Sequence, residues 1–425
     1  MQMYIVLGIM VFMIVSLILN KWPYGLTAMI CCILLALTGI MDVENAFSGL
    51  SMKNTILIAG MYVISDAFGR TSMISNFRKR MMTMQSGKSD FLLIAILMAI
   101  NIFFAQFLPA SANITVMIMI INVLSSDGEV CASRLLLPVA ALSSLWSSKI
   151  PIGMGTTGYL TMNKYISSYH SDQLLVVTDR FMVSCLPLIT GTLFTLFAYK
   201  LLPKRQIDAS KLKKIKETDA ISKRDEAIIY AVFLITMAAM FLNSVLGDLM
   251  YIVPVIGVVI LMLTKAMSQK DVQKVLSSDQ LFMIAGVLVM AEALAASGAG
   301  EAIGNSILTV LGGNPGGIKV LVVFAIVTVV MTTFLSNSGS RHILEPLAVA
   351  TAISAGFDPR GIVLVVNLCS CCSTLLPTGA PATAIAFAAG NYKLSETLKY
   401  TVPLTVIVMV SAILSANFFF PVYGR

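Results

Sequence analysis

The chain has 425 residues, of which 57% are hydrophobic and only 12% are charged, and its mean hydropathy is +0.89. Soluble proteins carry about 25% charged residues, so this composition excludes a soluble protein and predicts a multi-pass membrane protein. The net charge of +8 would suit a nucleic acid, but the basic residues gather in polar segments between apolar runs. We therefore expect membrane lipid, and no nucleic acid, as a partner.

Apolar runs long enough to cross about 30 Å of hydrocarbon recur along the chain. In the first half they predict helices over residues 3–19, 25–40, 54–68 and 181–201, and two interrupted segments over 90–124 and 135–165. In the second half they predict helices over 226–243, 249–263, 280–296 and 400–420, and interrupted segments over 318–355 and 361–389. The first run lacks a preceding basic residue and a cleavage site, so we interpret it as a retained helix.

The two halves repeat each other weakly. "IAGMYVISDAF" begins at Ile58 and "IAGVLVMAEAL" begins at Ile284, and each copy carries one acidic residue, Asp66 or Glu292. Further along, "FLPAS" corresponds to "FLSNS", and "PIGMGTTGY" corresponds to "LPTGAPATAI". Collinear matches of this kind predict a repeat over 1–201, a linker over 202–225 and a second repeat over 226–425.

The basic residues predict the orientation. The linker is the most basic segment, so we expect it to be cytoplasmic. If 90–124 and 318–355 are re-entrant hairpins, most of the 29 Lys and Arg residues lie on the cytoplasmic side. Arg180 then falls in an outer loop, and Lys149 and Arg341 fall within the membrane. The predicted fold is all-α and polytopic, with two inverted repeats of about five spans and one hairpin each.

The two hairpin tips carry small and polar residues inside apolar runs. "FLPASANIT" begins at Phe107 and "FLSNSGS" begins at Phe334. Non-helical backbone at membrane depth is tolerated where it is buried in protein or lines a wet cavity. Packing of small residues between helices is the alternative for either tip taken alone. Because the tips occupy corresponding places in the repeats, we predict that they meet at a binding site.

Each half also contains a broken helix, over 135–165 and 361–389. Pro381 suits the first turn of a new half-helix, whose free N–H groups and positive dipole end favour an anion. "SSKIPIGMGTTGYL" repeats this arrangement in the first half. A proline kink without a binding function is the alternative.

The run "CCSTLLPTGAPATAIAFAAGNY", which begins at Cys371, resembles the signature that closes the second half of divalent anion/sodium symporters. "FLSNS" resembles that family's Ser-Asn-Thr hairpin motif, with Ser336, Asn337 and Ser338 in its three places. The resemblance implies a homodimeric elevator-type symporter or antiporter in the bacterial cytoplasmic (inner) membrane. It implies C4-dicarboxylate or tricarboxylate substrates and Na⁺ as the coupling ion.

The tips and breaks supply the predicted site residues. The substrate-binding residues are predicted to be Ser111, Asn113, Lys149, Met154, Thr156, Thr157, Asn337, Ser338, Ala380 and Thr383. A sodium ion is predicted at Ser336, Asn337, Gly153 and Gly379, and Arg341, His342 and Glu345 are further charged or titratable groups at membrane depth. Intramembrane ionisable residues are usually functional, although an ion pair between Arg341 and Glu345 could be structural.

The first half departs from the family pattern. Pro109-Ala110-Ser111 replaces the first Ser-Asn-Thr motif, and Pro and Ala offer no side-chain oxygen to a hard cation. A shifted register that brings Ser111, Asn113 and Thr115 to the tip remains open. Met154 and Ala380 stand where the family often has a hydroxyl. We therefore expect reduced or absent sodium coupling, with the Lys149 ammonium in place of an ion.

Other functions fit the sequence less well. It contains no HExxH, GxSxG or P-loop run and only two histidines, so we expect neither an enzyme nor an ATP-driven pump. The seven cysteines lack metal-ligand spacing, and we expect no cofactor other than Na⁺ as a coupling ion. The runner-up function is a related inverted-repeat antiporter for cations or arsenite.

Overall fold

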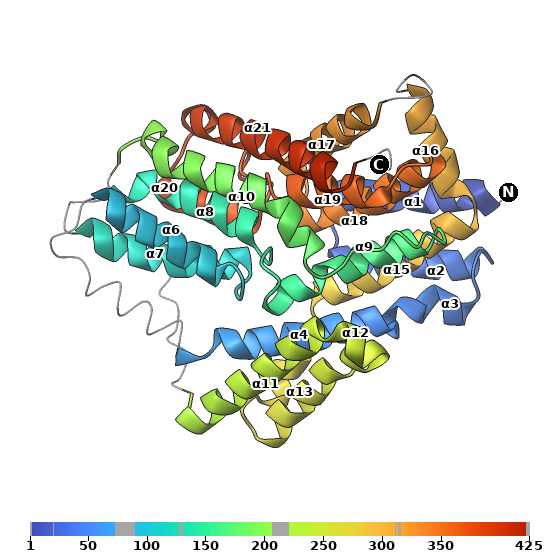
Figure 1. Cartoon of the computed structure of the whole chain (residues 1–425), viewed down its shortest axis with the longest axis horizontal. Helices are drawn as coiled ribbons and strands as arrows, with labels where there is room; N and C mark the ends of the chain where they lie inside the picture. Colours follow the sequence, from blue (N-terminus) through green and yellow to red (C-terminus); the bar gives the residue numbers. More distant parts are fainter. Residues whose placement is uncertain are drawn as a thin grey trace.

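The computed structural model describes residues 2–19, 21–72, 90–126, 131–205, 221–310, 312 and 316–421. All regular secondary structure within these ranges is helical, as the sequence predicts (Figure 1). The helices of the first half are α1 (Gln2–Leu19), α2 (Tyr24–Leu37), α3 (Val43–Phe47), η1 (Ser48–Leu50), α4 (Lys53–Gly69), α6 (Asp90–Phe104), α7 (Ala110–Ser126), η2 (Ala132–Arg134), α8 (Leu136–Trp146), η3 (Gly153–Thr156), α9 (Gly158–Ser167), α10 (Asp179–Ala198) and η4 (Tyr199–Leu201).

The second half repeats the order of a long helix, a hairpin, a broken helix and a closing helix. Its helices are α11 (Lys223–Phe241), α12 (Asn243–Leu246), η6 (Gly247–Tyr251), α13 (Val253–Leu263), α14 (Gln269–Leu276), α15 (Asp279–Ala296), α16 (Ala299–Val310), α17 (Gly317–Phe334), α18 (Asn337–Ser354), α19 (Pro359–Cys369), α20 (Pro381–Gly390) and α21 (Leu394–Phe419). In this order α4 corresponds to α15, α10 to α21, and the pair α6–α7 to α17–α18.

Within the described ranges, five helices are long and apolar enough to cross a membrane. They are Val43–Gly69, Asp179–Leu201, Asp279–Ala296, Gly317–Phe334 and Leu394–Phe419. Shorter apolar helices accompany them, including both parts of the second broken helix, α19 and α20. The chain is therefore a multi-pass membrane protein, as its composition predicts.

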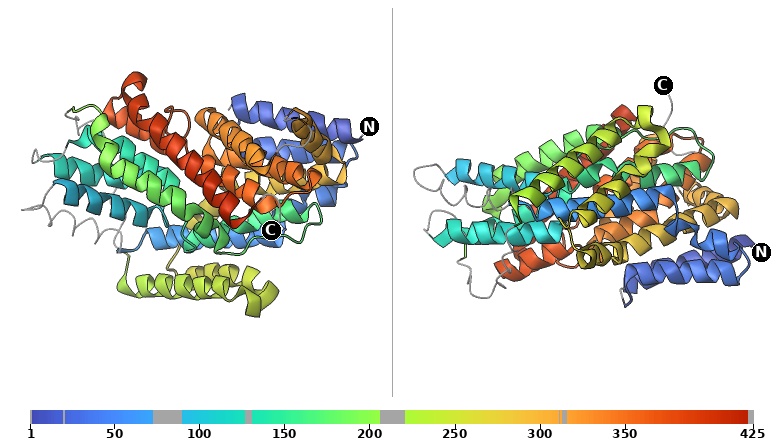
Figure 2. Two further views of the ribbon diagram at one scale, coloured as in Figure 1. Left: turned by 45° about the horizontal axis from the view of Figure 1, so that its top comes forward. Right: turned by 90° about the horizontal axis from the view of Figure 1, so that it is seen from below.

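The predicted interruptions are present as breaks between helices. The run 90–124 is divided between α6 and α7, and 318–355 is divided between α17 and α18. The hairpins α6–α7 and α17–α18 lie toward opposite ends of the molecule's long axis, and their tips point inward (Figures 1 and 2). The sequence did not predict α14 and α16. Residues 206–220 of the predicted linker lie outside the described residues, so its cytoplasmic placement stays a prediction.

Small residues let the helices of the two halves approach closely. α2 packs along α15, and a Cβ on Gly286 of α15 would lie 2.7 Å from the Cβ of Ala28 of α2. Such close backbone approach is how membrane helices gain dispersion contacts without a hydrophobic drive from water. α10 of the first half likewise packs along α21 of the second half. Within the second half, α11 lies against α13 at one edge of the molecule (Figure 2). Of these pairs, α10 and α21 are equivalent helices of the two halves.

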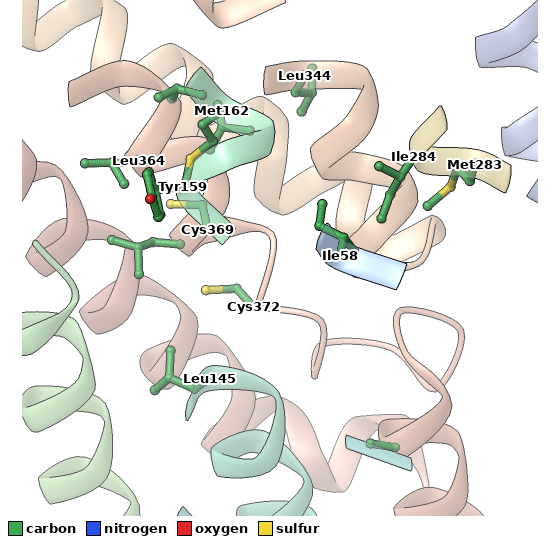
Figure 3. Packing of buried hydrophobic residues seen from close by; sticks show 14 of the residues in the cluster. Ile58, Leu145, Tyr159, Met162, Met283, Ile284, Leu344, Leu364, Cys369 and Cys372 are labelled. Atoms are coloured by element: carbon green, nitrogen blue, oxygen red, sulfur yellow. The ribbon is translucent and has the colours of Figure 1, made fainter. Parts of the chain in front are cut away.

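The buried core reaches the centre of the molecule. Figure 3 shows Tyr159 of α9 beside Leu364 and Cys369 of α19, while Ile58 of α4 lies near Ile284 of α15. Ile58 and Ile284 begin the two copies of the repeated sequence. The repeated segments therefore face each other across the middle of the fold.

Candidate functional site

One large cavity lies where the hairpins and broken helices meet. Its volume is about 830 Å³. Residues 106–112 of the first hairpin and 336–338 of the second both line it. α4 and α15 complete the wall through residues that include Ile58 and Ile284. The cavity is therefore built from equivalent parts of both halves, as the sequence predicts.

The first tip is held by Gln106. Its amide nitrogen donates to the carbonyl of Trp146 at 3.0 Å, and its amide oxygen accepts from the N–H of Ile150 at 3.1 Å. These bonds fix the tip against the break between α8 and α9. Pro109-Ala110-Ser111 lies at the turn into α7 and lines the cavity.

Asn113 lies behind the tip. Its amide nitrogen donates to Asn101 Oδ1 at 2.9 Å and to Ser143 Oγ at 3.0 Å, and the side chain is fully buried. The Thr115 hydroxyl donates back to the carbonyl of Ser111 at 2.6 Å. Asn113 therefore ties α7 to α6 and α8, and the shifted register considered for this tip is not the one adopted.

The second tip is a capped helix start. Ser336 is the N-cap of α18, and its hydroxyl accepts from the N–H of Gly339 at 3.1 Å. The Asn337 amide oxygen accepts from the Thr332 hydroxyl at 3.3 Å, and Arg341 donates to Ser338 Oγ at 3.4 Å. These bonds aim the first turn of α18 at the cavity.

Six of the described helices begin with a residue that lines this cavity. Two of them are α2 at Tyr24 and α15 at Asp279, where the Asp279 carboxylate accepts from the N–H groups of Tyr24 and Gly25. The others begin at Ala110 of α7, Gly158 of α9, Asn337 of α18 and Pro381 of α20. A helix N-terminus presents unpaired N–H groups and carries about half a positive charge. Converging N-termini favour an anion in the space between them.

Buried charged side chains form the inner wall. Lys149 Nζ donates to Asn367 Oδ1 at 3.2 Å, and Arg180 Nε donates to the same oxygen at 3.0 Å. The Asn367 amide nitrogen donates to Glu345 Oε1 at 2.8 Å. Lys149, Arg180 and Glu345 are only 1%, 4% and 2% exposed, so their charges lie outside bulk water. With Arg341, which also lines the cavity, this group holds three cations and one carboxylate.

Gly158 makes room for the guanidinium of Arg180. A Cβ at position 158 would lie 2.2 Å from Arg180 Nη1, closer than any ordinary contact. Arg180 Nη1 also donates to the carbonyl of Ser148 at 2.9 Å. Only glycine at this start of α9 lets Arg180 reach both Ser148 and Asn367.

The predicted residues divide into two sets. Those that line the cavity are Ser111, Met154, Thr157, Ser336, Asn337, Ser338, Arg341, His342, Glu345 and Ala380. Those that do not are Asn113, Lys149, Gly153, Thr156, Gly379 and Thr383. Lys149 belongs to the inner wall but does not line the cavity itself; it donates to Asn367, which does. The Thr156 hydroxyl donates a hydrogen bond to the carbonyl of Gly153, and the Thr383 hydroxyl donates one to the carbonyl of Ser373.

Three placements correct the sequence analysis. Arg180 does not lie in a loop, because it belongs to the first turn of α10 and is buried at the cavity wall; its place on the outer side stays a prediction. The ion pair considered between Arg341 and Glu345 is absent from the described residues, and Glu345 instead accepts from Asn367. Asn367 was missed, although a single amide within the apolar run "GIVLVVNLC" is itself a signal. The Nδ1 atom of His342 and the hydroxyl of Tyr165 form a hydrogen bond of 3.0 Å.

The second half offers oxygen atoms that suit a sodium ion. The carbonyls of Ser373 and Thr332 lie 2.5 and 2.9 Å from where a Cβ on Gly379 would stand. The Ser373 hydroxyl is buried and has no hydrogen-bond partner among the described residues. The Asn337 amide oxygen accepts from the hydroxyl of Thr332, whose carbonyl is one of these two. Hard cations bind carbonyl, hydroxyl and amide oxygens, so this set fits one ion.

The matching place in the first half offers fewer oxygen atoms. Gly153 adopts a φ of +59°, and its N–H donates to the sulfur of Met237 at 2.9 Å. The carbonyl oxygen of Gln106 lies 3.5 Å from where its Cβ would stand, and the rings of Phe233 and Phe107 lie 3.7 and 3.9 Å away. Sulfur and aromatic carbon are poor ligands for sodium, so the surroundings of Gly153 suit this ion less well than those of Gly379.

The acidic residues of the repeat both form ion pairs. Asp66 pairs with Arg70 at 2.7 Å, and Glu292 pairs with Lys164 at 2.5 Å. Arg70 also pairs with Asp271 at 3.1 Å, so this cluster holds one cation and two carboxylates. Asp279, which also lines the cavity, accepts from the N–H groups of Tyr24 and Gly25. The surplus of positive charge therefore belongs to the inner wall.

Comparisons with known proteins agree with this geometry. The sequence model of the citrate transporter (CitMHS) family matches residues 14–367. An uncharacterized transporter of Haemophilus influenzae is 23% identical, over 91% of this chain and 85% of its own length. Sodium/sulfate cotransporter 1 of Chlamydomonas reinhardtii is 22% identical, over 46% of this chain and 23% of its own length. The resemblance to divalent anion/sodium symporters is thus confirmed.

A solved structure shares the fold. The Alcanivorax borkumensis YdaH transporter, described as having an unusual topology, superposes with a TM-score of 0.62. It is 12% identical and covers 92% of this chain and 90% of its own. At this identity the likeness shows the architecture alone.

Proposed function

Because the chain belongs to the citrate transporter family, we propose that it is a secondary carrier of small organic dianions in the bacterial cytoplasmic membrane. The substrates are C4-dicarboxylates or tricarboxylates. The observation that carries this proposal is the inner wall, where Lys149, Arg180 and Arg341 stand against Glu345. Sulfate is the dianion named in one relative, and it belongs in the same test.

Charge balance explains the preference for a dianion. Three cations and one carboxylate leave two positive charges in excess at a buried site. An isolated charge at mid-membrane costs at least about 2.5–3.5 kcal/mol. A dianion offsets the whole excess, whereas a monoanion offsets half of it. A cation would add to the excess, so the cavity does not favour the alternative of a cation antiporter.

The carrier has at most one sodium-binding site in this proposal. The oxygens around Gly379 suit one ion, while Lys149 supplies a fixed positive charge to the half in which one carbonyl oxygen, that of Gln106, lies near Gly153 beside sulfur and aromatic rings. Transport then depends shallowly on sodium, or not at all. An empty inner wall keeps its excess charge, so return of the carrier without an anion is unfavourable and exchange of anions is favoured.

We place the motion in an elevator mechanism. The hairpins, broken helices, α10 and α21 form the moving part, and α2, α4, α13 and α15 form the scaffold of each protomer in a homodimer. The contacts between these two parts include polar ones, such as the partly buried ion pair of Lys164 with Glu292 and the 3.2 Å bond from the Asn54 amide to the carbonyl of Leu160. A neutral hydrogen bond of the second kind contributes about 0.5–1.5 kcal/mol, so it does not prevent sliding.

Uptake into proteoliposomes tests the proposal. Labelled succinate, citrate and sulfate are offered to vesicles that contain the same unlabelled anion, with and without a sodium gradient. We expect uptake of at least one of them, and loss of that uptake in Asn337→Ala, because the amide both donates and accepts at the second tip. The variant should elute from size exclusion as the wild type does. Failure of the wild type to transport any dianion, or wild-type rates in Asn337→Ala, would contradict the proposal.

A further inference from the structure

A single amide joins the buried charges of the two halves. Asn367 lies within α19 and is 2% exposed. Its oxygen accepts from Lys149 and Arg180 of the first half, and its nitrogen donates to Glu345 of the second. The partners determine which way the amide points. The two cations only donate hydrogen bonds, so they face the amide oxygen, and the carboxylate only accepts, so it faces the amide nitrogen. Asn367 is thus the meeting point of the inner wall.

The amide of Asn367 is neutral, and this decides how it affects the charges beside it. It gives both cations a hydrogen-bond acceptor, so neither is left unsatisfied in a buried place. It does not cancel their charge. Neither Lys149 nor Arg180 forms an ion pair with any described residue. Their charges stay available to an anion in the cavity, which Arg180 and Asn367 both line.

A carboxylate in the same position would behave differently. Aspartate has nearly the shape of asparagine and would accept the same two hydrogen bonds from Lys149 and Arg180. Beside Glu345, at 2.8 Å, the new carboxyl would share a proton with that of Glu345; with glutamine at position 345 it would be ionised and would lower the excess at the inner wall by one. Position 367 therefore controls the charge of the site without changing its size.

We propose that Asn367 is the specificity-determining residue that sets the charge of the anion this carrier accepts. It positions Lys149 and Arg180 as a pair without neutralising them, and this leaves room for two negative charges on the substrate. The inference rests on the proposed function, because it assumes that the cavity binds the transported anion.

The test uses two substitutions of opposite sign. Glu345→Gln adds one unit to the excess charge while keeping the shape of the side chain, and Asn367→Asp made in the Glu345→Gln background removes that unit again without a second carboxyl to share its proton. Full-length protein in proteoliposomes is offered succinate and its monomethyl ester, or sulfate and methanesulfonate if sulfate is the anion that the wild type transports. Binding of each anion is also followed by thermal shift, since a ligand that binds only the folded state stabilises it. Asn305→Asp, on the exposed face of α16, adds the same charge away from the cavity.

The ratio of dianion to monoanion transport decides the outcome. Relative to Glu345→Gln alone, we expect added Asn367→Asp to lower this ratio at least about tenfold, because one charge at this range in a buried site is worth more than a tenfold change in affinity. Glu345→Gln should raise the ratio, and Asn305→Asp should leave it unchanged. A parallel fall of dianion and monoanion transport in both inner-wall variants would overturn the inference and assign Asn367 a structural role only.

The same experiment separates this inference from the proposal it rests on. If the wild type transports and binds none of the dianions, the proposed function fails. If the wild type transports a dianion and the ratio is unchanged in the variants, the inference alone fails. Should Asn367→Asp not fold, Glu345→Gln still carries the comparison.

Discussion

Substituting Gly158 by alanine is the most local perturbation of the inner wall that the structure offers. The three atoms nearest to the new Cβ all belong to Arg180, with Nη1 at 2.2 Å, Cζ at 2.9 Å and Cδ at 3.4 Å. An ordinary contact needs about 3.4 Å or more, so the guanidinium has to retreat by about 1 Å. This movement strains or breaks its bonds to Ser148 and Asn367, which are 2.9 and 3.0 Å long.

The size of the effect follows from these bonds. A hydrogen bond to a charged group contributes about 1.5–3 kcal/mol, and overpacking a buried site costs about 1–3 kcal/mol. We therefore expect Gly158→Ala to weaken dianion affinity about 10- to 100-fold and to lower the melting temperature in detergent. The matched control is Gly8→Ala in α1, where no heavy atom lies within 4 Å of the new Cβ. Alanine favours a helix over glycine by up to about 1 kcal/mol, so this control should keep or raise stability.

A double-mutant cycle shows whether the clash acts through Arg180. Uptake and melting are measured for Gly158→Ala, Arg180→Ala and the double variant. Once Arg180 is truncated, the alanine at position 158 has room, and we expect it to cost almost nothing more. Additive losses, or wild-type affinity in Gly158→Ala alone, would refute the reasoning.

Three further predictions concern other parts of the fold. Lys149→Ala should weaken dianion binding more than tenfold, since it removes a buried positive charge, and equilibrium binding of the transported anion measures this loss. Reversing Lys164 or Glu292 alone should slow transport, while reversing both should restore it in a charge-swap uptake assay, because the pair joins α9 to α15. Cys371, which lines the cavity, should react with a negatively charged methanethiosulfonate faster than with a positively charged one. The bound dianion should protect it, and equal rates with no protection would place the thiol away from the site.

The sequence predicted the architecture because the breaks are local features. Ser336 caps α18 and Pro381 begins α20, and both signals are read from neighbouring residues without knowledge of the fold. Tip and break residues that lie at these helix starts, such as Asn337 and Thr157, were correctly placed at the cavity. The short amphipathic helix α14 was missed, because "QKDVQKVL" has neither the length nor the hydropathy of a span.

The inner wall depends on contacts between residues far apart in the chain, and this limited what the sequence could predict. Arg180 follows the polar stretch "VVTD" at the start of α10, so it looks like a loop charge. Its place is set by Asn367 and by the space at Gly158. Asn113 presents the reverse case, because it looks like part of a polar tip while its amide bonds to Asn101 and Ser143. Both outcomes follow from the rule that buried polar groups must find partners wherever the fold provides them.

The central claim is that fixed cations at the inner wall bind a dianion and take the place of a sodium ion. Its most direct measurement is the sodium dependence of dianion exchange by the wild type in proteoliposomes. Vesicles loaded with unlabelled dianion are given labelled dianion outside, while sodium is replaced stepwise by choline at constant ionic strength. The account predicts exchange that continues in choline, with at most a shallow, non-cooperative rise as sodium is added. A steep, cooperative requirement for sodium, with no exchange in its absence, would contradict it.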